Sequence, residues 1–200
     1  MSTSSRKKRP YHHGGLQAAL LRAAGILLEK EGIEGLSVRE AARRAGVSHN
    51  APYRHFPERE ALLAALAAEG FARLGKAQRK AAGASGLRGM GEAYVRFALE
   101  HPQRFRLMLG GQVSLAKNAP LREVATRVFE ALSGALAARV PKAQRARDAS
   151  IAAWALVHGL ALLLLDQRIA SAARCCRDDA ALVREVLASI RFAIGPAQSA

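Results

Sequence analysis

The residues from Ser37 to Phe56, SVREAARRAGVSHNAPYRHF, carry the most informative chemistry in this chain. The second half of the segment is rich in side chains that donate or accept hydrogen bonds, namely His49, Asn50, Tyr53, Arg54 and His55. Such side chains on a short exposed helix suit the donor and acceptor pattern of base edges in the major groove of DNA. A short surface helix in any all-helical protein would have a similar composition, so spacing alone leaves both interpretations open.

Two helices joined by a tight turn are predicted to position these side chains. Ser37 is a favourable N-cap, and Glu40 three residues later completes a capping box. Apolar residues then recur at helical spacing, with arginines on the other side of the helix. Gly46 falls where a left-handed residue ends a helix most readily. The pattern predicts a helix that packs on a neighbour and turns sharply at Gly46.

The second helix of the motif is predicted over His49–Phe56. Val47 is apolar and would anchor the turn, while Ser48 is placed to cap the helix. Pro52 is close enough to the helix start to be tolerated there, and Pro57 ends the helix. Together the two helices have the layout of a helix-turn-helix.

Three segments of residues 16–74 resemble the DNA-binding domain of the TetR family of bacterial transcriptional repressors. They are Ala-Gly-Val-Ser at 45–48, Tyr-Arg-His-Phe-Pro at 53–57 and Arg-Glu-Ala-Leu-Leu at 59–63. The resemblance implies that Tyr53 and the first residue of the next helix hold phosphates. That residue is Arg59 where the family has lysine, and Pro52 stands where leucine or isoleucine is more typical. Arginine keeps the charge but changes the contact geometry.

The predicted DNA-binding set divides into two roles. Arg43, Arg44, Tyr53 and Arg59 are expected to contact phosphates, which give affinity but little sequence information. Base edges are expected to be contacted by His49, Asn50 and Ser48. The complete set is Ser37, Arg39, Arg43, Arg44, Ser48, His49, Asn50, Ala51, Pro52, Tyr53, Arg54, His55 and Arg59.

The charge of the chain is consistent with a polyanionic partner. The formal net charge is +15 over 200 residues, and half of the residues are hydrophobic, which is enough for a core. An arginine- and alanine-rich proteome would produce the same charge without any meaning for partners. Residues 1–14 are predicted to be a flexible basic arm, in which Arg6–Arg9 either enters a minor groove or forms a solvated tail.

The whole chain is predicted to be all-α, with about nine helices and no strand alternation. The three helices of residues 15–75 form the helix-turn-helix domain, with the first helix starting near Leu16 and ending near Gly32. A fourth helix begins at Glu58, and a break is expected at 83–86. Residues 76–200 form a helical effector-binding and dimerisation domain, with helices expected at 87–100, 103–109, 121–140, 143–171 and 178–194.

The C-terminal part has a second resemblance, to the TetR-family ligand-binding domain type marked by Trp and then His-Gly. It rests on Trp154 with His158-Gly159, and on His101-Pro102 and Phe-Arg-Leu-Met at 105–108. The resemblance implies a homodimer in which the last two long helices pair with their copies. Residues that either line an effector pocket or form plain core are Tyr94, Phe97, Phe105, Met108, Phe129, Trp154 and His158.

Other classes of protein have little support. The sequence has no HExxH, GxSxG, CxxC or glycine-rich phosphate-binding motif, so we expect no enzyme, metal site or cofactor. The apolar stretch Ile151–Leu165 is short for a membrane span and is expected to be a buried helix. Cys175-Cys176 is either a redox-sensitive pair or an ordinary loop segment. We expect a cytoplasmic protein without a targeting signal.

The sequence therefore predicts a DNA-binding transcriptional regulator. The expected mode is a homodimeric repressor bound to a near-palindromic operator of double-stranded DNA and released by an unknown small-molecule effector. Two alternatives stay open. One is a non-specific architectural DNA-binding protein, and the other is an enzyme or ligand-binding helical protein with an incidental motif.

Overall fold

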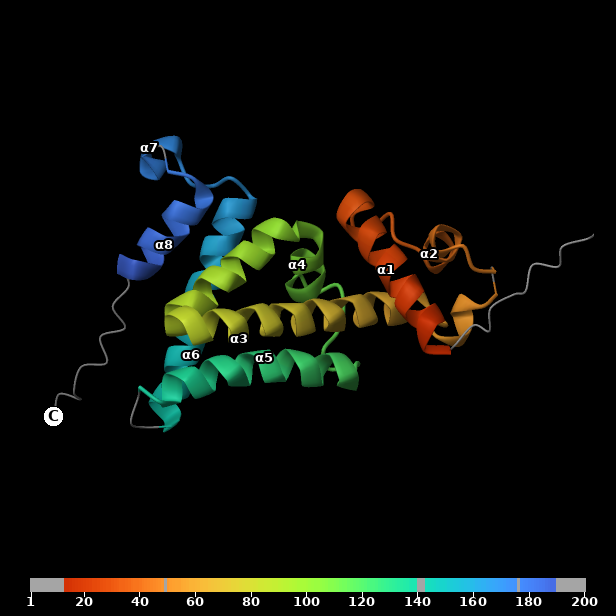
Figure 1. Cartoon of the computed structure of the whole chain (residues 1–200), viewed down its shortest axis with the longest axis horizontal. Coiled ribbons are helices and arrows are strands. Elements are labelled where there is room, and N and C mark those ends of the chain that lie inside the picture. The colour runs from red at the N-terminus through yellow and green to blue at the C-terminus, as the bar shows by residue number, and fades with distance from the viewer. Residues whose placement is uncertain (1–12, 49, 140–142, 176, 190–200) are drawn as a thin grey trace, which may run out of the picture. The chain divides into compact units, whose positions relative to one another are not determined.

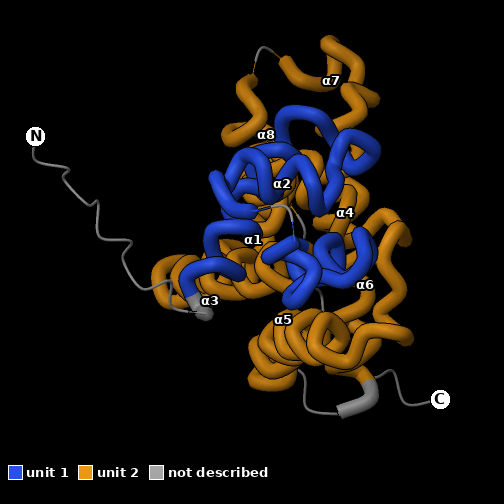
Figure 2. The backbone as a smooth tube through the Cα atoms, turned by 90° about the vertical axis from the view of Figure 1, so that its right-hand side faces the viewer, with its two compact units in different colours: residues 1–66 blue, residues 67–200 orange. Residues whose placement is uncertain are grey.

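A computed structural model describes residues 13–48, 50–139, 143–175 and 177–189. These residues contain eight α-helices, one 3-10 helix and no strand, which confirms the all-α prediction (Figure 1). The chain divides into two compact units, residues 1–66 and 67–200 (Figure 2). From the sequence, we predict this boundary after residue 75. A single helix runs through both residue 66 and residue 75, so no loop or change in composition marks the boundary.

The core of the first unit is built from helices α1 (His13–Glu31) and α2 (Val38–Ala45), which pack against each other. The predicted apolar positions are buried, as in Leu20, Leu27 and Leu28 of α1 and Ala41 of α2. Ser37 caps α2, because its Oγ accepts from the N–H of Glu40 at 3.1 Å. The predicted capping box is only half formed, since the Glu40 carboxylate instead accepts hydrogen bonds from Arg43.

The turn after α2 has the geometry that the sequence predicted. Gly46 lies in the left-handed region at φ 67° and ψ 30°. The N–H of Val47 donates to the Ala42 carbonyl at 3.1 Å, and the N–H of Gly46 donates to the Arg43 carbonyl at 3.2 Å. These two bonds form a Schellman motif, which satisfies two of the carbonyls left open at the end of α2.

The second helix of the motif is shorter than the sequence predicted. In place of an α-helix over His49–Phe56, the structure has a single 3-10 turn, η1 (Pro52–Arg54). The Pro52 carbonyl accepts at 2.9 Å from the N–H groups of both His55 and Phe56. Pro57 has no N–H to extend the ladder and disfavours helical geometry at the residue before it. The two prolines therefore limit the helix to one turn.

The long helix α3 (Arg59–Glu100) starts in the first unit and continues into the second. Its dihedrals are non-helical at Gly86, with φ 59° and ψ −142°, so the break predicted for 83–86 falls at the last of these residues. After α3, helix α4 (Pro102–Leu109) begins with proline at its first position, as expected.

Helices α5 (Ala119–Ala137), α6 (Ala143–Leu165), α7 (Ser171–Arg174) and α8 (Asp179–Ser189) complete the second unit. Within this unit α5 runs beside α3, where the position of a Gly75 Cβ would lie 3.2 Å from Val128, and α5 also contacts α6 (Figure 1). Asn118 caps α5 by accepting from the N–H of Leu121 at 3.0 Å.

Helix α6 ends earlier than its sequence suggested, at Leu165 and not at 171. Gln167 adopts φ 53°, in the left-handed region where glycine is more usual. The N–H of Arg168 donates to the Leu163 carbonyl at 2.8 Å and that of Gln167 to the Leu164 carbonyl at 3.1 Å, which is a second Schellman motif. The short helix α7 follows.

The surface of α6 is more apolar than one chain can cover. Its Arg145–Leu165 portion has a mean hydropathy of 1.8, and only 28% of an 18-residue apolar window in it is buried. By length and composition this portion would also be able to cross a membrane. The buried positions face α5 and α3, while Ile151 and Leu163 are 56% and 46% exposed. The expectation of a fully buried helix is not met within one chain.

The left-handed turn at Gly46 gives a direct test of the motif's geometry. No atom lies within 4 Å of the place where a Gly46 Cβ would be, so Gly46→Ala introduces backbone strain without a clash. We expect the free energy of unfolding to fall by about 1 kcal/mol, measured by urea denaturation followed by circular dichroism.

Gly15→Ala is the matched control, because its Cβ site is equally open and the residue lies in α1 of the same unit. That substitution is expected to leave the stability unchanged or raise it. Equal effects of the two substitutions would show that Gly46 is not under left-handed constraint.

Candidate functional site

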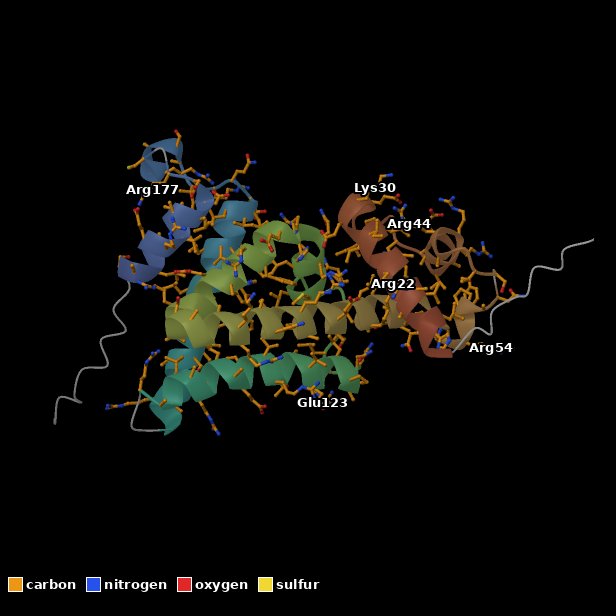
Figure 3. The ribbon with its side chains drawn as sticks, viewed as in Figure 1. Arg22, Lys30, Arg44, Arg54, Glu123 and Arg177 are labelled. Atoms are coloured by element: carbon orange, nitrogen blue, oxygen red, sulfur yellow. The ribbon has the colours of Figure 1, made fainter. Side chains whose placement is uncertain are left out.

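The motif's predicted contact residues differ in how far they are exposed. Asn50, Tyr53 and Arg54 are exposed on the turn and η1, and Ser48 is exposed just before them. Figure 3 shows Arg54 and Arg44 on the outside of the first unit, where a phosphate backbone would be accessible to their guanidinium groups. His49 lies outside the described residues, as do Arg6–Arg9 of the predicted basic arm.

Several other residues of the predicted DNA-binding set instead stabilise the fold of the first unit. Pro52 is buried, and Ala51 and His55 are half-buried. Phe56 beside them is 3% exposed, so the turn is anchored in the unit's core by its apolar side. Ser37 is half-buried and serves as the N-cap of α2. Pro52 therefore holds the turn in place, and Asn50, Tyr53 and Arg54 around it are exposed.

The arginines of α2 are not equivalent. Arg43 forms an ion pair with Glu40, and the hydrogen bond from Arg43 holds the pKa of the Glu40 carboxyl below its usual value. Glu40 therefore offsets part of the Arg43 charge that a phosphate contact would use. Arg39 and Arg44 lie on the same helix and are exposed. Basic and acidic residues nearly balance between residues 13 and 66, so the chain's net charge of +15 comes mainly from elsewhere.

Arg59 has a local role that the sequence did not reveal. Its Nε donates to the Leu36 carbonyl at 2.8 Å, and its Nη2 donates to the Ile33 carbonyl. These bonds tie the start of α3 to the loop between α1 and α2. A lysine at this position has one ammonium group and lacks the planar fork that makes both contacts. The phosphate role implied by the family resemblance stays a prediction for Arg59.

The second unit contains a cavity of about 470 Å³, within the usual size range of small-molecule sites. It lies among α3, α5, α6 and α8, and most of its lining is apolar. The residues that line it are Phe71, Leu74, Gln78, Leu87, Arg88, Met90, Gly91, Tyr94, Leu109, Leu115, Ala125, Thr126, Val128, Phe129, Leu132, Ala153, Trp154, Leu156, Val157 and Leu187.

Of the seven residues predicted for a pocket, Tyr94, Phe129 and Trp154 line this cavity. The structure places the other four behind or beside the lining. Phe97 stacks edge-on against His101, and Phe105 packs on Tyr94 with ring centroids 5.5 Å apart. Met108 is buried on α4. His158 contacts the cavity wall through Tyr94.

A hydrogen-bonded chain links the aromatic groups of the wall. The indole N–H of Trp154 donates to the Tyr94 hydroxyl at 3.1 Å, and that hydroxyl lies 3.0 Å from Nδ1 of His158. Burial raises the pKa of the Tyr94 hydroxyl, so the hydroxyl stays protonated and can donate a hydrogen bond to Nδ1 of His158. Desolvation lowers the pKa of His158, which favours the neutral imidazole that accepts this bond.

Gln78 is a buried polar lining residue that was not predicted from the sequence. Its side chain is 6% exposed, although it belongs to a stretch that seems polar in the sequence. Gln78 lies on α3 four residues after Leu74 and seven after Phe71, so all three share one face of the helix. This spacing is the signal that would have placed Gln78 inside the unit.

The geometry defines a helical protein with a DNA-reading motif in one unit and a small-molecule cavity in the other. Residues 20–66 match the model of bacterial regulatory proteins of the tetR family. Residues 87–190 match the model of the tetracyclin repressor-like C-terminal domain. The second match alone covers more than half of the chain. The chain belongs to the TetR family of bacterial regulatory proteins and is a DNA-binding transcriptional regulator.

Solved structures are similar over nearly the whole chain. A Rhodococcus sp. RHA1 protein of unknown function is 32% identical, with a TM-score of 0.74, 90% of this chain and 96% of that chain covered. The multidrug binding protein EbrR in complex with ethidium is 25% identical, with a TM-score of 0.61 and coverages of 88% and 98%.

A TetR variant from Acinetobacter baumannii AYE in complex with minocycline is 21% identical and shares the fold, with a TM-score of 0.59 and coverages of 89% and 95%. No curated protein matches the chain significantly in sequence.

The desolvation of His158 predicts a pH-dependent stability. The imidazole pKa is lowered in the folded chain, while the unfolded chain titrates near its ordinary value of 6.5. Above pH 6.5 His158 is neutral in both the folded and the unfolded chain, and its titration does not reduce the free energy of unfolding. As the pH falls below 6.5, the unfolded chain takes up this proton first, and the free energy of unfolding decreases.

His158→Phe removes the titrating group and is expected to flatten this part of the profile. Histidine NMR signals measured against pH give the direct check, with the His158 resonance expected to titrate below pH 6.5. Titration at or above that pH would contradict a desolvated imidazole at this position.

Proposed function

We propose that the chain is a sequence-specific repressor that binds a near-palindromic operator as a homodimer and is released from it by a small molecule. The observation that carries the proposal is the exposed polar turn, Asn50 to Arg54, which the Schellman motif and buried Pro52 hold at the edge of the first unit. Phosphate contacts from Arg44 and Tyr53 would set the position, and Asn50, His49 and Ser48 would contact bases. The repressor acts in the cytoplasm.

The apolar surface of α6 supports the homodimer. Ile151 and Leu163 are exposed on this helix, at 56% and 46%. Large apolar side chains grouped on one helix of a folded unit indicate a surface that is covered in the assembled protein. A two-fold axis through α6 and α8 would bury this surface against its copy and give a four-helix contact.

The two-fold symmetry determines what the operator must look like. A dimer presents two identical motifs, so the DNA it recognises has two half-sites related by the same axis. For helix-turn-helix dimers the half-sites lie about one helical turn, roughly 34 Å, apart. A small molecule that binds the dimer only when the two motifs are at one particular distance would favour that distance. If the distance differs from the half-site spacing, the affinity for the operator falls.

The cavity of the second unit is the proposed effector site. It is enclosed by helices that include α6, the helix of the proposed dimer contact. Ligand binding there would therefore act on the element that positions the two motifs. EbrR and the TetR variant were solved with ethidium and minocycline respectively, which supports small-molecule binding by this chain as well.

Two substitutions distinguish phosphate contacts from base contacts. Tyr53→Phe removes a hydroxyl and is expected to weaken binding to all DNA sequences alike. Asn50→Ala is expected to relax the preference at one base position per half-site, by about 1–3 kcal/mol against the correct base. Both are measured by fluorescence anisotropy on DNA from upstream of the protein's own gene and on random DNA of equal length.

A changed base preference in Tyr53→Phe, or an unchanged one in Asn50→Ala, would contradict the assigned roles. Equal and steeply salt-dependent binding of the wild-type protein to all DNA would instead favour a non-specific architectural protein.

The proposed dimer contact is tested by charge insertion. Leu163→Glu places a carboxylate in the apolar surface of α6 and is expected to convert the dimer into a monomer, because an unpaired charge is costly to bury. Ile26→Glu is the matched control, since Ile26 is an equally large side chain, 53% exposed, on α1.

Sedimentation velocity gives the mass of each variant. A monomer for Leu163→Glu with a dimer for Ile26→Glu supports the contact. A wild-type protein that is itself monomeric, or a Leu163→Glu variant that stays dimeric, would contradict it.

A further inference from the structure

The cavity wall contains one buried hydrogen-bond acceptor that has no partner. Gln78 is 6% exposed and lines the cavity, and its Oε1 forms no hydrogen bond in the part of the chain that the structure describes. Buried polar atoms of folded proteins are almost always paired, and an unpaired one destabilises the fold. An acceptor that is kept unpaired beside an empty space is therefore suited to a ligand that supplies the donor.

Three of the other polar side chains of the wall are already engaged, and the fourth, Thr126, is exposed to solvent. The Trp154 N–H donates to Tyr94, and the Tyr94 hydroxyl bonds to His158. Arg88 is an exposed side chain whose Nε lies 3.8 Å from a Glu92 carboxylate oxygen. These pairings leave Gln78 as the buried acceptor that can select for one chemical group on a ligand.

The charges of the wall favour one class of ligand. Arg88 is the charged residue among the described lining residues; it is exposed and lies 3.8 Å from a Glu92 carboxylate oxygen. No aspartate or glutamate is among the described lining residues, so the wall has no carboxylate to pair with a cationic ligand buried in an apolar site. The remaining lining is mainly aliphatic and aromatic, which matches an uncharged, largely apolar molecule.

We propose that the cavity binds a neutral, largely apolar molecule whose O–H or N–H group donates a hydrogen bond to Oε1 of Gln78. The proposal rests on the proposed function of the cavity as an effector site and adds the chemical class of the effector. Gln78 supplies selectivity for the donor, and the apolar wall supplies most of the affinity.

The test uses the full-length protein and three uncharged probes. Nile red has no O–H or N–H group, so it reports on the cavity without depending on Gln78. The competitors 4-phenylphenol and 4-methoxybiphenyl share a biphenyl body, and only the phenol has a donor. Each displaces Nile red in a fluorescence titration, which gives the ratio of their two dissociation constants.

Gln78→Met keeps the length of the side chain and removes the acceptor. We expect it to weaken 4-phenylphenol relative to 4-methoxybiphenyl by about three- to ten-fold, the effect of losing one hydrogen bond. Nile red affinity should stay unchanged. Thr126→Val is the matched control, because it removes another polar group from the lining without removing the Gln78 acceptor, and it should leave the ratio unchanged.

A second measurement does not depend on any probe. Without ligand, Gln78→Met removes a buried unpaired acceptor, so the variant is expected to melt at a higher temperature than the wild type. Gln78→Leu removes the same acceptor with a different side-chain shape. The ratio of dissociation constants and the melting temperature are measured for it as well. Higher stability combined with weaker phenol binding is the result expected of an acceptor kept for a ligand.

The outcomes separate the inference from the function on which it rests. If Nile red binds, and the ratio of the dissociation constants of 4-phenylphenol and 4-methoxybiphenyl is the same in wild type and both Gln78 variants, the cavity binds ligands but the proposed hydrogen bond to Gln78 is overturned. If Nile red and both competitors fail to bind the wild type, the proposed effector site is contradicted, and the proposed hydrogen bond is contradicted with it. A lower melting temperature in both variants would show that Gln78 is a structural residue and would overturn the proposal.

Discussion

The apolar surface of α6 is the constraint on which the second unit depends. One side of this helix packs on α5 and closes the cavity, and it contributes Trp154 and Val157 to the wall. The other side keeps Ile151 and Leu163 exposed within one chain. Because apolar burial is the main favourable term in folding, a helix with two such sides favours a second subunit as its partner. The cavity and the proposed dimer contact are therefore two sides of one element, so a ligand in the cavity would contact the same helix that forms the proposed dimer contact.

The DNA-reading motif is held by backbone geometry more than by charge. The Schellman turn at Gly46 ends α2, and Pro52 and Phe56 anchor the following turn in the core. Arg59 adds a tether from α3 to the loop before α2. Because acidic and basic residues nearly balance between residues 13 and 66, the proposed sequence-specific binding would depend on where a few side chains are placed. A chain with charge but without this placement would bind DNA without selecting sequences.

The sequence predicted those parts of the fold that are determined locally. Apolar spacing located α1 and α2, and the glycines marked the turn at Gly46 and the break at Gly86. Local patterns failed where a non-glycine residue adopts a left-handed conformation, as Gln167 does at the end of α6. Local patterns also failed to predict the cavity lining, because an aromatic residue type does not indicate whether its side chain lines a cavity between helices or packs in the core. Phe105 is core, whereas Gln78 lines the cavity although its neighbours in the sequence are polar.

Selection of DNA from a random-sequence pool by the full-length protein tests the central claim most directly. A sequence-specific homodimer is expected to enrich an inverted repeat whose half-sites are centred about one helical turn apart. Binding of the enriched sequence should exceed that of random DNA by roughly 10³-fold or more. Enrichment of a single unrepeated half-site would contradict the dimer. Failure to enrich any sequence, with salt-sensitive binding to the whole pool, would contradict the specific regulator and leave a protein that binds DNA through charge alone.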